Sequence, residues 1–337
     1  MGKSIGYIKK ENLLFNKLDK AVSIIITKNL GIRKNESLLV VYDSRQHELA
    51  KKFSEVASKS LKKVDMLKIP VAKVNGQEPP KKAVHKFLQY DVLIFLTTRS
   101  LSHTKARREA TAKGIRIASM PGVTPSVLRR SIDIDYDRLK ATIKKVAARL
   151  NKAKKVRIKT SLGTDIEFSI TKRKAHGLSA GIYNKKGKWG NLPEGEVFIA
   201  PVEGTANGIF VVDGSLAGFG KITHPLIFFV ENGYVTKITN GRKIPRIKKM
   251  LDRVGKKAGN IAEFGIGFNS RAKVTGIVLE DEKAAKTCHL ALGNNIGFGG
   301  KTDVPLHIDC VIKKPTMFLD NKPIIKKGRL NIQGKYI

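Results

Sequence analysis

Short apolar runs alternate with helical patterns through the first 150 residues, and this alternation most constrains the fold. Ser37–Tyr42 and Val92–Thr97 have the length and apolar composition of buried strands. Gln46–Lys62 and Thr104–Lys113 carry apolar residues at helical spacing. Strand, helix and strand at this spacing favour parallel pairing with right-handed crossovers. We therefore expect an N-terminal α/β domain over residues 1–150, with a parallel sheet and flanking helices.

The pattern changes after about residue 153. Short alternating runs separated by Gly, Asn and Pro dominate, as in Val156–Thr160, Gly208–Val212 and Val235–Thr239. Such runs are signals of antiparallel strands and hairpins. One helical pattern, Lys243–Ala258, interrupts them. We expect residues 151–337 to form a mostly antiparallel α+β domain.

The chain is strongly basic. It has 65 Lys and Arg residues against 28 Asp and Glu residues, which gives a net charge of +37. Such a charge attracts polyanions whether or not that is its function. The basic residues are spread along the whole sequence, and no RNP-like aromatic pair, GXXG clamp or zinc finger accompanies them. We expect nonspecific binding of nucleic acid or other polyanions, and charge alone does not decide the function.

The sequence predicts no contact with a membrane. The longest apolar runs, such as Val92–Leu96, are far too short to cross a bilayer, and the N-terminus lacks the apolar stretch of a signal peptide. Two cysteines, Cys288 and Cys310, cannot form a disulfide framework. We expect a cytoplasmic protein with reduced thiols.

A histidine and an aspartate share one predicted strand near the C-terminus. If Leu306–Ile312 is a strand, its period of two places His307 and Asp309 on the same face. An imidazole and a carboxylate side by side can bind one divalent metal. By itself this pattern is weak, because such a pair more often lies on a surface.

Other polar residues stand within apolar segments of the same domain. Glu196, Glu263 and His289 each lie among apolar, glycine-flanked residues, where an uncompensated charge is costly. With His307 and Asp309 they make three carboxylates and two imidazoles. This ligand set suits divalent ions such as Zn, Co or Mn and is large enough for two of them. Periodicity does not show that these strands meet in space.

Four segments, in this order, resemble the aminopeptidase T and aminopeptidase S family of metallopeptidases, in particular its archaeal leucyl aminopeptidase branch. They are Asn191–Pro201, Glu263–Gly267, His289–Gly293 and His307–Asp309. Gln77–Pro80 and Ser100–Arg108 in the N-terminal half also resemble that branch.

This resemblance implies a homodimeric metallo-aminopeptidase, a hydrolase that removes N-terminal residues from peptides. Two divalent ions per chain (Zn, Co or Mn) would be held by Glu196, Glu263, His289, His307 and Asp309. The two ions would activate a water molecule and polarise the scissile carbonyl. Glu196 or Glu263 would act as general base.

The sequence departs from the pattern of that family at one position. Its typical members place a tyrosine about seven residues beyond the histidine of the third segment, whereas this chain has Asn294–Phe298 there, without a tyrosine. Two other functions therefore stay open. One is a mononuclear iron ring-cleaving dioxygenase, a relative of this fold, with His289, His307 and Asp309 as its ligands. The other is a non-catalytic protein that binds nucleic acid or ribosomes.

Three residues are weaker candidates for substrate binding. His103 follows the predicted strand Val92–Thr97, and loops after parallel strands are where α/β domains place ligand contacts. Arg107 is a candidate partner for a carboxylate of the substrate. Asn294 is a candidate donor in place of the missing tyrosine.

Overall fold

The computed structural model describes residues 16–332 and 335–336 of the 337-residue chain. The chain divides into two compact units. Unit 1 takes Met1–Tyr136 and Gly181–Glu194, and unit 2 takes Asp137–Ala180 and Gly195–Ile337. A single division near residue 150 does not describe these units, because a later segment of the chain returns to unit 1.

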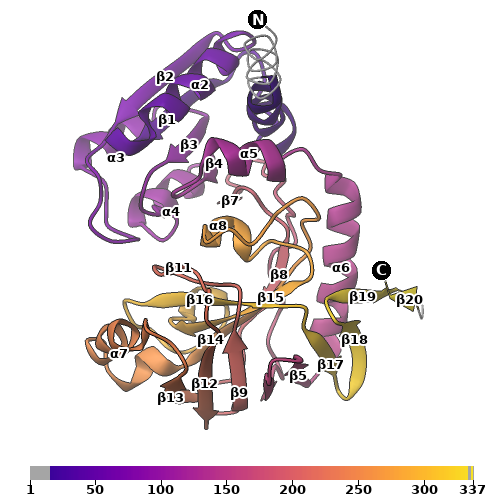
Figure 1. Ribbon diagram of the computed structural model, residues 1–337. Coiled ribbons are helices and arrows are strands. Elements are labelled where there is room, and N and C mark those ends of the chain that lie inside the picture. Colours follow the sequence, from indigo (N-terminus) through magenta and orange to yellow (C-terminus); the bar gives the residue numbers. More distant parts are fainter. Residues whose placement is uncertain (1–15, 333–334, 337) are drawn as a thin grey trace, which may run out of the picture. The chain divides into compact units, whose positions relative to one another are not determined.

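Unit 1 is built on a five-stranded parallel sheet in the order β2-β1-β3-β4-β7 (Figure 1). The chain alternates strand and helix, as the sequence predicted. The strands are β1 Ser37–Tyr42, β2 Lys63–Lys68, β3 Val92–Leu96, β4 Arg116–Ser119 and β7 Trp189–Asn191. Residues 16–24 are helical and continue into the π-helical segment η1 Ile25–Asn29. The further helices are α2 His47–Ser58, α3 Lys81–Phe87, α4 Lys105–Ala112 and α5 Pro125–Ser131, with the short 3-10 turn η2 Ser44–Gln46.

Apolar strands explain why this sheet forms the core of unit 1. Every residue of β1 and of β3 is buried. Leu39, Leu93 and Phe95 belong to one buried cluster with residues of α3 and α4. Strand β7 was not expected, because it lies in the segment that returns to unit 1.

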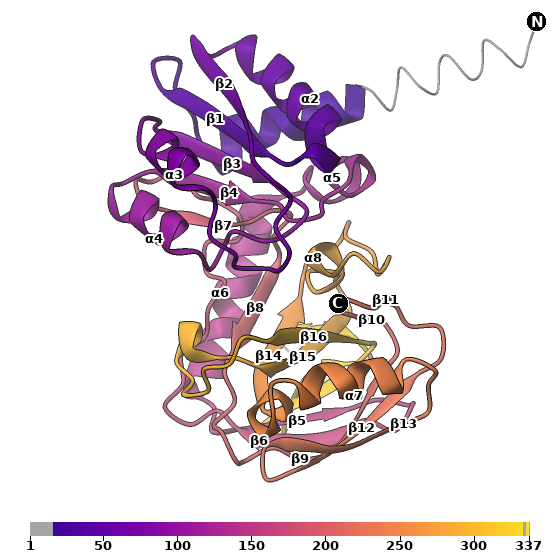
Figure 2. The same ribbon diagram turned by 90° about the vertical axis from the view of Figure 1, so that its left-hand side faces the viewer.

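Unit 2 holds two antiparallel sheets, of which one has six strands and the other nine (Figure 2). The six-stranded sheet has the order β11-β10-β16-β15-β14-β8, with β8 Glu196–Ile199, β10 Ser215–Leu216, β11 Gly220–Lys221, β14 Ile261–Gly267, β15 Thr287–Gly293 and β16 His307–Lys313. The nine-stranded sheet has the order β13-β12-β9-β6-β5-β17-β18-β19-β20. Its strands are β5 Lys155–Lys159, β6 Asp165–Ser169, β9 Asn207–Val212, β12 Leu226–Glu231, β13 Tyr234–Thr239, β17 Thr316–Leu319, β18 Lys322–Lys326, β19 Arg329–Ile332 and β20 Lys335–Tyr336.

Three helices accompany these sheets, together with two short 3-10 turns. The helices are α6 Tyr136–Lys152, α7 Ile244–Asp252 and α8 Val278–Asp281, and the turns are η3 Lys256–Gly259 and η4 Ile296–Phe298. The helix expected over Lys243–Ala258 is thus shorter: α7 ends at Asp252, and the 3-10 turn η3 is a separate element after it. At the coarse level, the expectation of a mixed α/β protein with parallel and antiparallel sheets is confirmed.

Strands β14 and β15 are interior strands of the six-stranded sheet and are buried along their whole length. Polar side chains on these two strands therefore lie in the interior, where they need partners. Within the part of the chain that the structure describes, no helix is long and apolar enough to cross a membrane.

Candidate metal centre

Four neighbouring strands of the six-stranded sheet carry the candidate site. Strand β8 contributes Glu196, β14 contributes Glu263, β15 contributes His289, and β16 contributes His307 and Asp309. The strand register places Gly265 of β14 opposite His289. A Cβ atom at Gly265 would lie 2.1 Å from Nε2 of His289, so the imidazole lies across β14 where this glycine leaves room.

Glu263 stands between the two imidazoles. Its Oε1 lies 3.3 Å from Nε2 of His289, and its Oε2 lies 3.3 Å from Nε2 of His307. Oδ1 of Asp309 also lies 3.3 Å from Nε2 of His307. We call Glu263, His307 and Asp309 the histidine end of the site, because one ligand atom from each lies within 4.8 Å of the others, close enough to hold one metal ion.

A backbone carbonyl fixes the orientation of His307. Its Nδ1 lies 2.9 Å from the carbonyl oxygen of Asn294. A carbonyl can only accept, so Nδ1 carries the hydrogen and donates it. Nε2 is then the atom that faces the carboxylates. Metal-binding histidines commonly use the same arrangement, in which the second ring nitrogen donates to a carbonyl and orients the ring.

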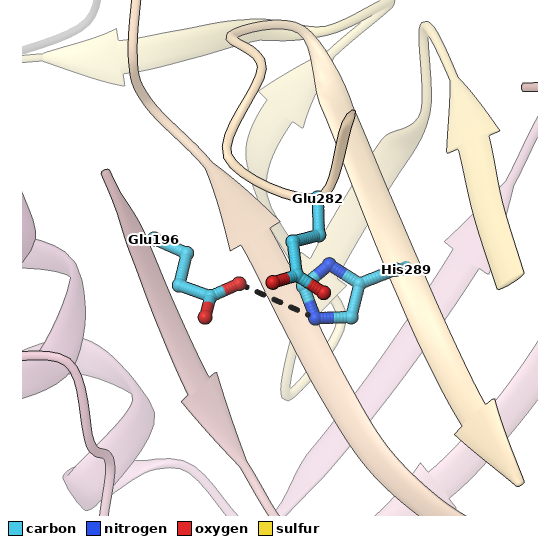
Figure 3. A group of neighbouring side chains, drawn as sticks. All are labelled: Glu196, Glu282 and His289. Atoms are coloured by element: carbon cyan, nitrogen blue, oxygen red, sulfur yellow. Dashed lines mark ion pairs between the residues drawn. The ribbon is translucent and has the colours of Figure 1, made fainter. Parts of the chain in front are cut away.

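A buried lysine is ion-paired with two carboxylates of the same cluster. The Lys283 side chain is 3% exposed, and its ammonium forms ion pairs with Glu196 and, at 2.6 Å, with Glu282. We call these three residues the lysine end of the site. Figure 3 shows Glu196 and Glu282 pointing toward His289, whose Nε2 is 3.5 Å from Oε2 of Glu196. Glu196, Glu282 and His289 form a second group whose ligand atoms can hold a metal ion.

Opposite charges shift the pKa values of the histidines. Burial lowers the pKa of His289, but its hydrogen bond to Glu263 and the charge of Glu196 outweigh burial and raise it to about 9. The pKa of His307 is likewise raised well above its usual value, by Asp309 and Glu263 against the effect of burial. The same contacts lower the pKa of Glu263 and of Asp309, although burial alone would raise both. Two protonated imidazoles therefore compensate the carboxylates when no metal ion is bound.

The five residues expected as metal ligands come together in space. Glu196, Glu263, His289, His307 and Asp309 lie within one connected set of ion pairs. Their metal binding itself stays a proposal. Sequence reasoning missed two members of the cluster, which are Glu282 and Lys283.

The three consecutive acids Glu280–Glu282 have different partners. Asp281 accepts hydrogen bonds from the backbone N–H groups of Thr275 and Gly276, and Glu280 accepts one from that of Lys273, so these two residues hold the local backbone. Glu282 differs, because its carboxylate faces Lys283 and His289. The local sequence carries no signal that separates the third acid from the other two.

The three weaker substrate-binding candidates have other contacts. His103 and Arg107 lie in unit 1. The Arg107 guanidinium stacks 3.8 Å from the centre of the Trp189 ring and donates to the Ser102 carbonyl at 2.8 Å.

Asn294 acts mainly through its backbone, which holds His307 as described above. Its side-chain amide donates to Asp303 Oδ1 at 2.8 Å and to the Val304 carbonyl at 3.0 Å. For all three candidates, substrate binding stays a prediction.

Aromatic rings pack beside the histidine end. The Phe298 ring stands edge-on to His307 with the ring centres 5.9 Å apart. Phe298 also stands edge-on to Phe198, and His176 stacks on Phe198 at 5.4 Å. Phe298 occupies the loop where a tyrosine was expected for a peptidase. An aromatic and largely apolar surface thus adjoins the histidine end.

Comparison with known proteins corrects the functional expectation. The model of the 2,5-dihydroxypyridine 5,6-dioxygenase family matches residues 28–332. The curated 2,5-dihydroxypyridine 5,6-dioxygenase of Pseudomonas putida is 22% identical over 253 residues, which are 70% of this chain and 70% of that protein.

Two solved structures share the fold. The 2,5-dihydroxypyridine dioxygenase of Pseudomonas putida superimposes with a TM-score of 0.78 at 17% identity, covering 96% of this chain and 98% of that one. AmpT from Thermus thermophilus superimposes with a TM-score of 0.69 at 14% identity, covering 94% and 99%.

The aminopeptidase interpretation was therefore wrong. Its four segments lie in a fold that this chain shares with AmpT, and they do not mark the peptidase activity. The hydrolase reaction, the peptide substrate and the role of Glu196 or Glu263 as general base in that reaction are withdrawn with it. Because the family model spans nearly the whole sequence, the chain belongs to the 2,5-dihydroxypyridine 5,6-dioxygenase family.

Proposed function

We propose that this protein is a metal-dependent dioxygenase that opens a dihydroxylated aromatic ring of the 2,5-dihydroxypyridine type. The observation that carries the proposal is the convergence of His289, His307 and Asp309 around Glu263 on three adjacent strands. Two histidines and one carboxylate are the ligand set of many oxygen-activating iron(II) enzymes. A related protein whose name states the same reaction supports the assignment.

One donor atom each from Glu263, His307 and Asp309 lies within 4.8 Å of the other two, a spacing that fits a single divalent ion such as iron(II). Nε2 of His289 lies 3.3 Å from Oε1 of Glu263, and we assign His289 to the same ion. Without a cation these atoms are compensated only by protons on the imidazoles, as the raised pKa values of both histidines indicate. A metal ion would take the place of those protons.

The residues of the chain would orient the reaction. The Asn294 carbonyl holds the Nδ1 hydrogen of His307, so that Nε2 stays directed at the ion. When bound there, iron would supply the redox chemistry with dioxygen. In the overall reaction of such an enzyme, the bond between two ring carbons breaks and each carbon receives one oxygen atom of the same O2 molecule, so no external reductant is consumed.

The aromatic surface beside His307 suits a planar substrate. Phe298 and Phe198 present ring edges and faces next to the histidine end, and aromatic rings prefer such stacked or edge-on contacts. A flat dihydroxylated ring would bury apolar area there while its hydroxyl groups face the ion and the carboxylates. An extended peptide would gain less from this surface.

Oxygen uptake tests the proposal. Iron-loaded protein is mixed with 2,5-dihydroxypyridine, and oxygen consumption is followed together with loss of the ring absorbance. We expect equal amounts of oxygen and ring to disappear, and His307→Ala to abolish both. His224→Ala is the matched control, because His224 is an exposed histidine of unit 2 whose Nδ1 contacts Thr223, and it should leave the rate unchanged. Iron-loaded protein that consumes no oxygen with any dihydroxylated ring would contradict the proposal.

A further inference from the structure

The lysine end of the site resembles a metal site in which the ammonium group of Lys283 takes the place of the metal ion. Two of the three members of one metal-capable group, Glu196 and Glu282, are the two carboxylates paired with Lys283. The side chains of Glu196 and Lys283 are 8% and 3% exposed, so water contributes little to their charge compensation. Buried carboxylates at this depth require a positive partner, and here a lysine provides it.

The ammonium and a metal ion would compete for the same oxygen atoms. Nζ of Lys283 lies 2.6 Å from Oε1 of Glu282 and still closer to Oε1 of Glu196. A divalent ion bound by these two oxygens would sit at ~2.0–2.2 Å from each. Because Nζ is 2.6 Å from the same Glu282 oxygen, the ion would lie less than ~5 Å from Nζ. At that distance in a poorly solvated site the repulsion between the two cations is strong, so Lys283 disfavours a second ion at the lysine end.

The backbone holds Lys283 at this position. Its N–H donates to the Glu280 carbonyl at 3.0 Å, and its own carbonyl accepts from Asn269 at 2.8 Å. At the end of β14, Gly267 pairs with Glu196, and a Cβ on Gly267 would meet the Lys283 carbonyl carbon at 2.8 Å. A glycine is thus what lets the Lys283 segment approach β14 beside Glu196. Backbone hydrogen bonds and close backbone packing therefore fix the position of Lys283.

We propose that Lys283 is a built-in cation that replaces a second metal ion, so that the site binds a single divalent ion at its histidine end. Glu196 is then a partner of the lysine. The histidine end (Glu263, His307 and Asp309) remains for the ion, together with His289, which lies 3.3 Å from Glu263. This inference rests on the metal binding of the proposed function, and it does not depend on which ring is the substrate.

Metal counting tests the inference. Metal-free protein is titrated with Mn²⁺, free and bound manganese are separated by equilibrium dialysis, and the bound ions are examined by electron paramagnetic resonance. We expect one Mn²⁺ per chain in the wild type and in Lys283→Arg, which keeps the positive charge. Lys283→Met has nearly the same length without the charge, and we expect it to bind two ions whose spectra show magnetic coupling.

A second lysine serves as the matched control. Lys243 is also in unit 2, and its ammonium donates to the backbone carbonyls of Phe219 and Lys221. Lys243→Met removes the same charge at a distance from the carboxylates, and it should still bind one ion. Two ions in the wild type, or one ion in folded Lys283→Met, would overturn the inference while leaving the proposed dioxygenase intact.

Glu282→Gln covers the case in which Lys283→Met does not fold. This variant keeps Lys283 paired with Glu196, and we expect it to bind one Mn²⁺ with affinity within a few fold of the wild type. A large loss of affinity would show that Glu282 binds the ion, and it would overturn the inference. A wild-type protein that binds no divalent ion would overturn both proposals. One bound ion without any oxygen consumption would overturn the proposed function alone.

Discussion

The lysine end and the histidine end of the site differ in how their carboxylates are compensated. At the lysine end, Glu196 and Glu282 face an ammonium that belongs to the chain. At the histidine end, Glu263 and Asp309 face imidazoles, whose positive charge depends on pH. A permanent internal cation closes one end to metal, whereas a proton can leave the other end and be replaced by a metal ion.

The two ends also differ in the solvent exposure of their side chains. The Lys283 side chain is 3% exposed, whereas that of His307 is 33% exposed. An ion and a substrate need access, and a structural charge pair needs exclusion of water. The end that we assign to chemistry is accordingly the more open of the two.

Replacing Asp309 should have the largest effect. Asp309→Asn keeps the shape but removes a charge from the histidine end, and we expect the affinity for a divalent ion to fall by more than ~100-fold, together with the activity. Calorimetric titration with Mn²⁺ measures this loss. Glu282→Gln removes a charge from the lysine end and should change the affinity far less. Equal losses in the two variants would erase the distinction between the ends.

Replacing Gly265 should displace His289, which contacts Glu196 of the lysine end and Glu263 of the histidine end. The new Cβ of Gly265→Ala would lie 2.1 Å from the His289 ring, so the imidazole must move out of its place. We expect a destabilisation of ~1–3 kcal/mol and a clear loss of metal affinity, measured by thermal unfolding with and without Mn²⁺. Gly297→Ala is a suitable control, because no atom lies within 4 Å of a Cβ built there. Unchanged metal affinity in Gly265→Ala would remove His289 from the set of ligands.

The effect of pH should differ between metal-free and metal-loaded protein. In the metal-free protein the pKa of His289 is raised to about 9, above its ordinary value near 6.5. A raised pKa in the folded state stabilises the fold fully below the unfolded-state pKa, and this contribution is lost as pH rises toward 9.

Metal binding expels the same protons, so the metal affinity should rise over that interval. We expect the melting temperature of the metal-free protein to fall between about pH 6.5 and about pH 9, while the gap to the metal-loaded protein widens. A gap that stays constant with pH would mean that metal does not displace these protons.

The smallest effect should come from the aromatic surface. Phe298→Ala removes a ring contact worth ~0.5–1.5 kcal/mol, so we expect KM for the ring substrate to rise by up to roughly tenfold with a smaller change in kcat. Phe298→Tyr keeps the ring and should behave like the wild type. Steady-state kinetics of both variants measures the difference. A change confined to kcat would show that Phe298 does not contact the substrate.

The local pattern predicted one pair of residues of the histidine end. His307 and Asp309 are two residues apart, so the period of a strand alone placed them on one face, and the structure puts His307 Nε2 3.3 Å from Asp309. Likewise, the strands predicted over Ser37–Tyr42 and Val92–Thr97 match β1 Ser37–Tyr42 and β3 Val92–Leu96 almost to the residue.

Long-range pairing was beyond the sequence. Glu196 and Glu263 stood out as acids in apolar strands, but only the order of β8, β14 and β15 brings them to His289. Lys283 is one of 65 Lys and Arg residues, and nothing local distinguishes it from the lysines that face solvent. The burial that defines its role depends on a close backbone approach at Gly267.

The wrong prediction of an aminopeptidase activity also arose because local segments do not show which residues meet in space. The four segments that resembled aminopeptidases belong to a fold that this chain shares with both AmpT and the Pseudomonas putida dioxygenase. Those segments do not include Lys283, which lies between two of them. In our account, Lys283 is the residue that limits the site to a single ion.

Isotope labelling of the product tests the central claim most directly. Iron-loaded protein is incubated with 2,5-dihydroxypyridine under ¹⁸O2 in ordinary water, and the ring-opened product is analysed at once by mass spectrometry. Our account predicts that both atoms of the labelled gas appear in the product of each turnover. Product without label, or with its new oxygen drawn from water, would contradict a dioxygenase and would require a different reaction at this site.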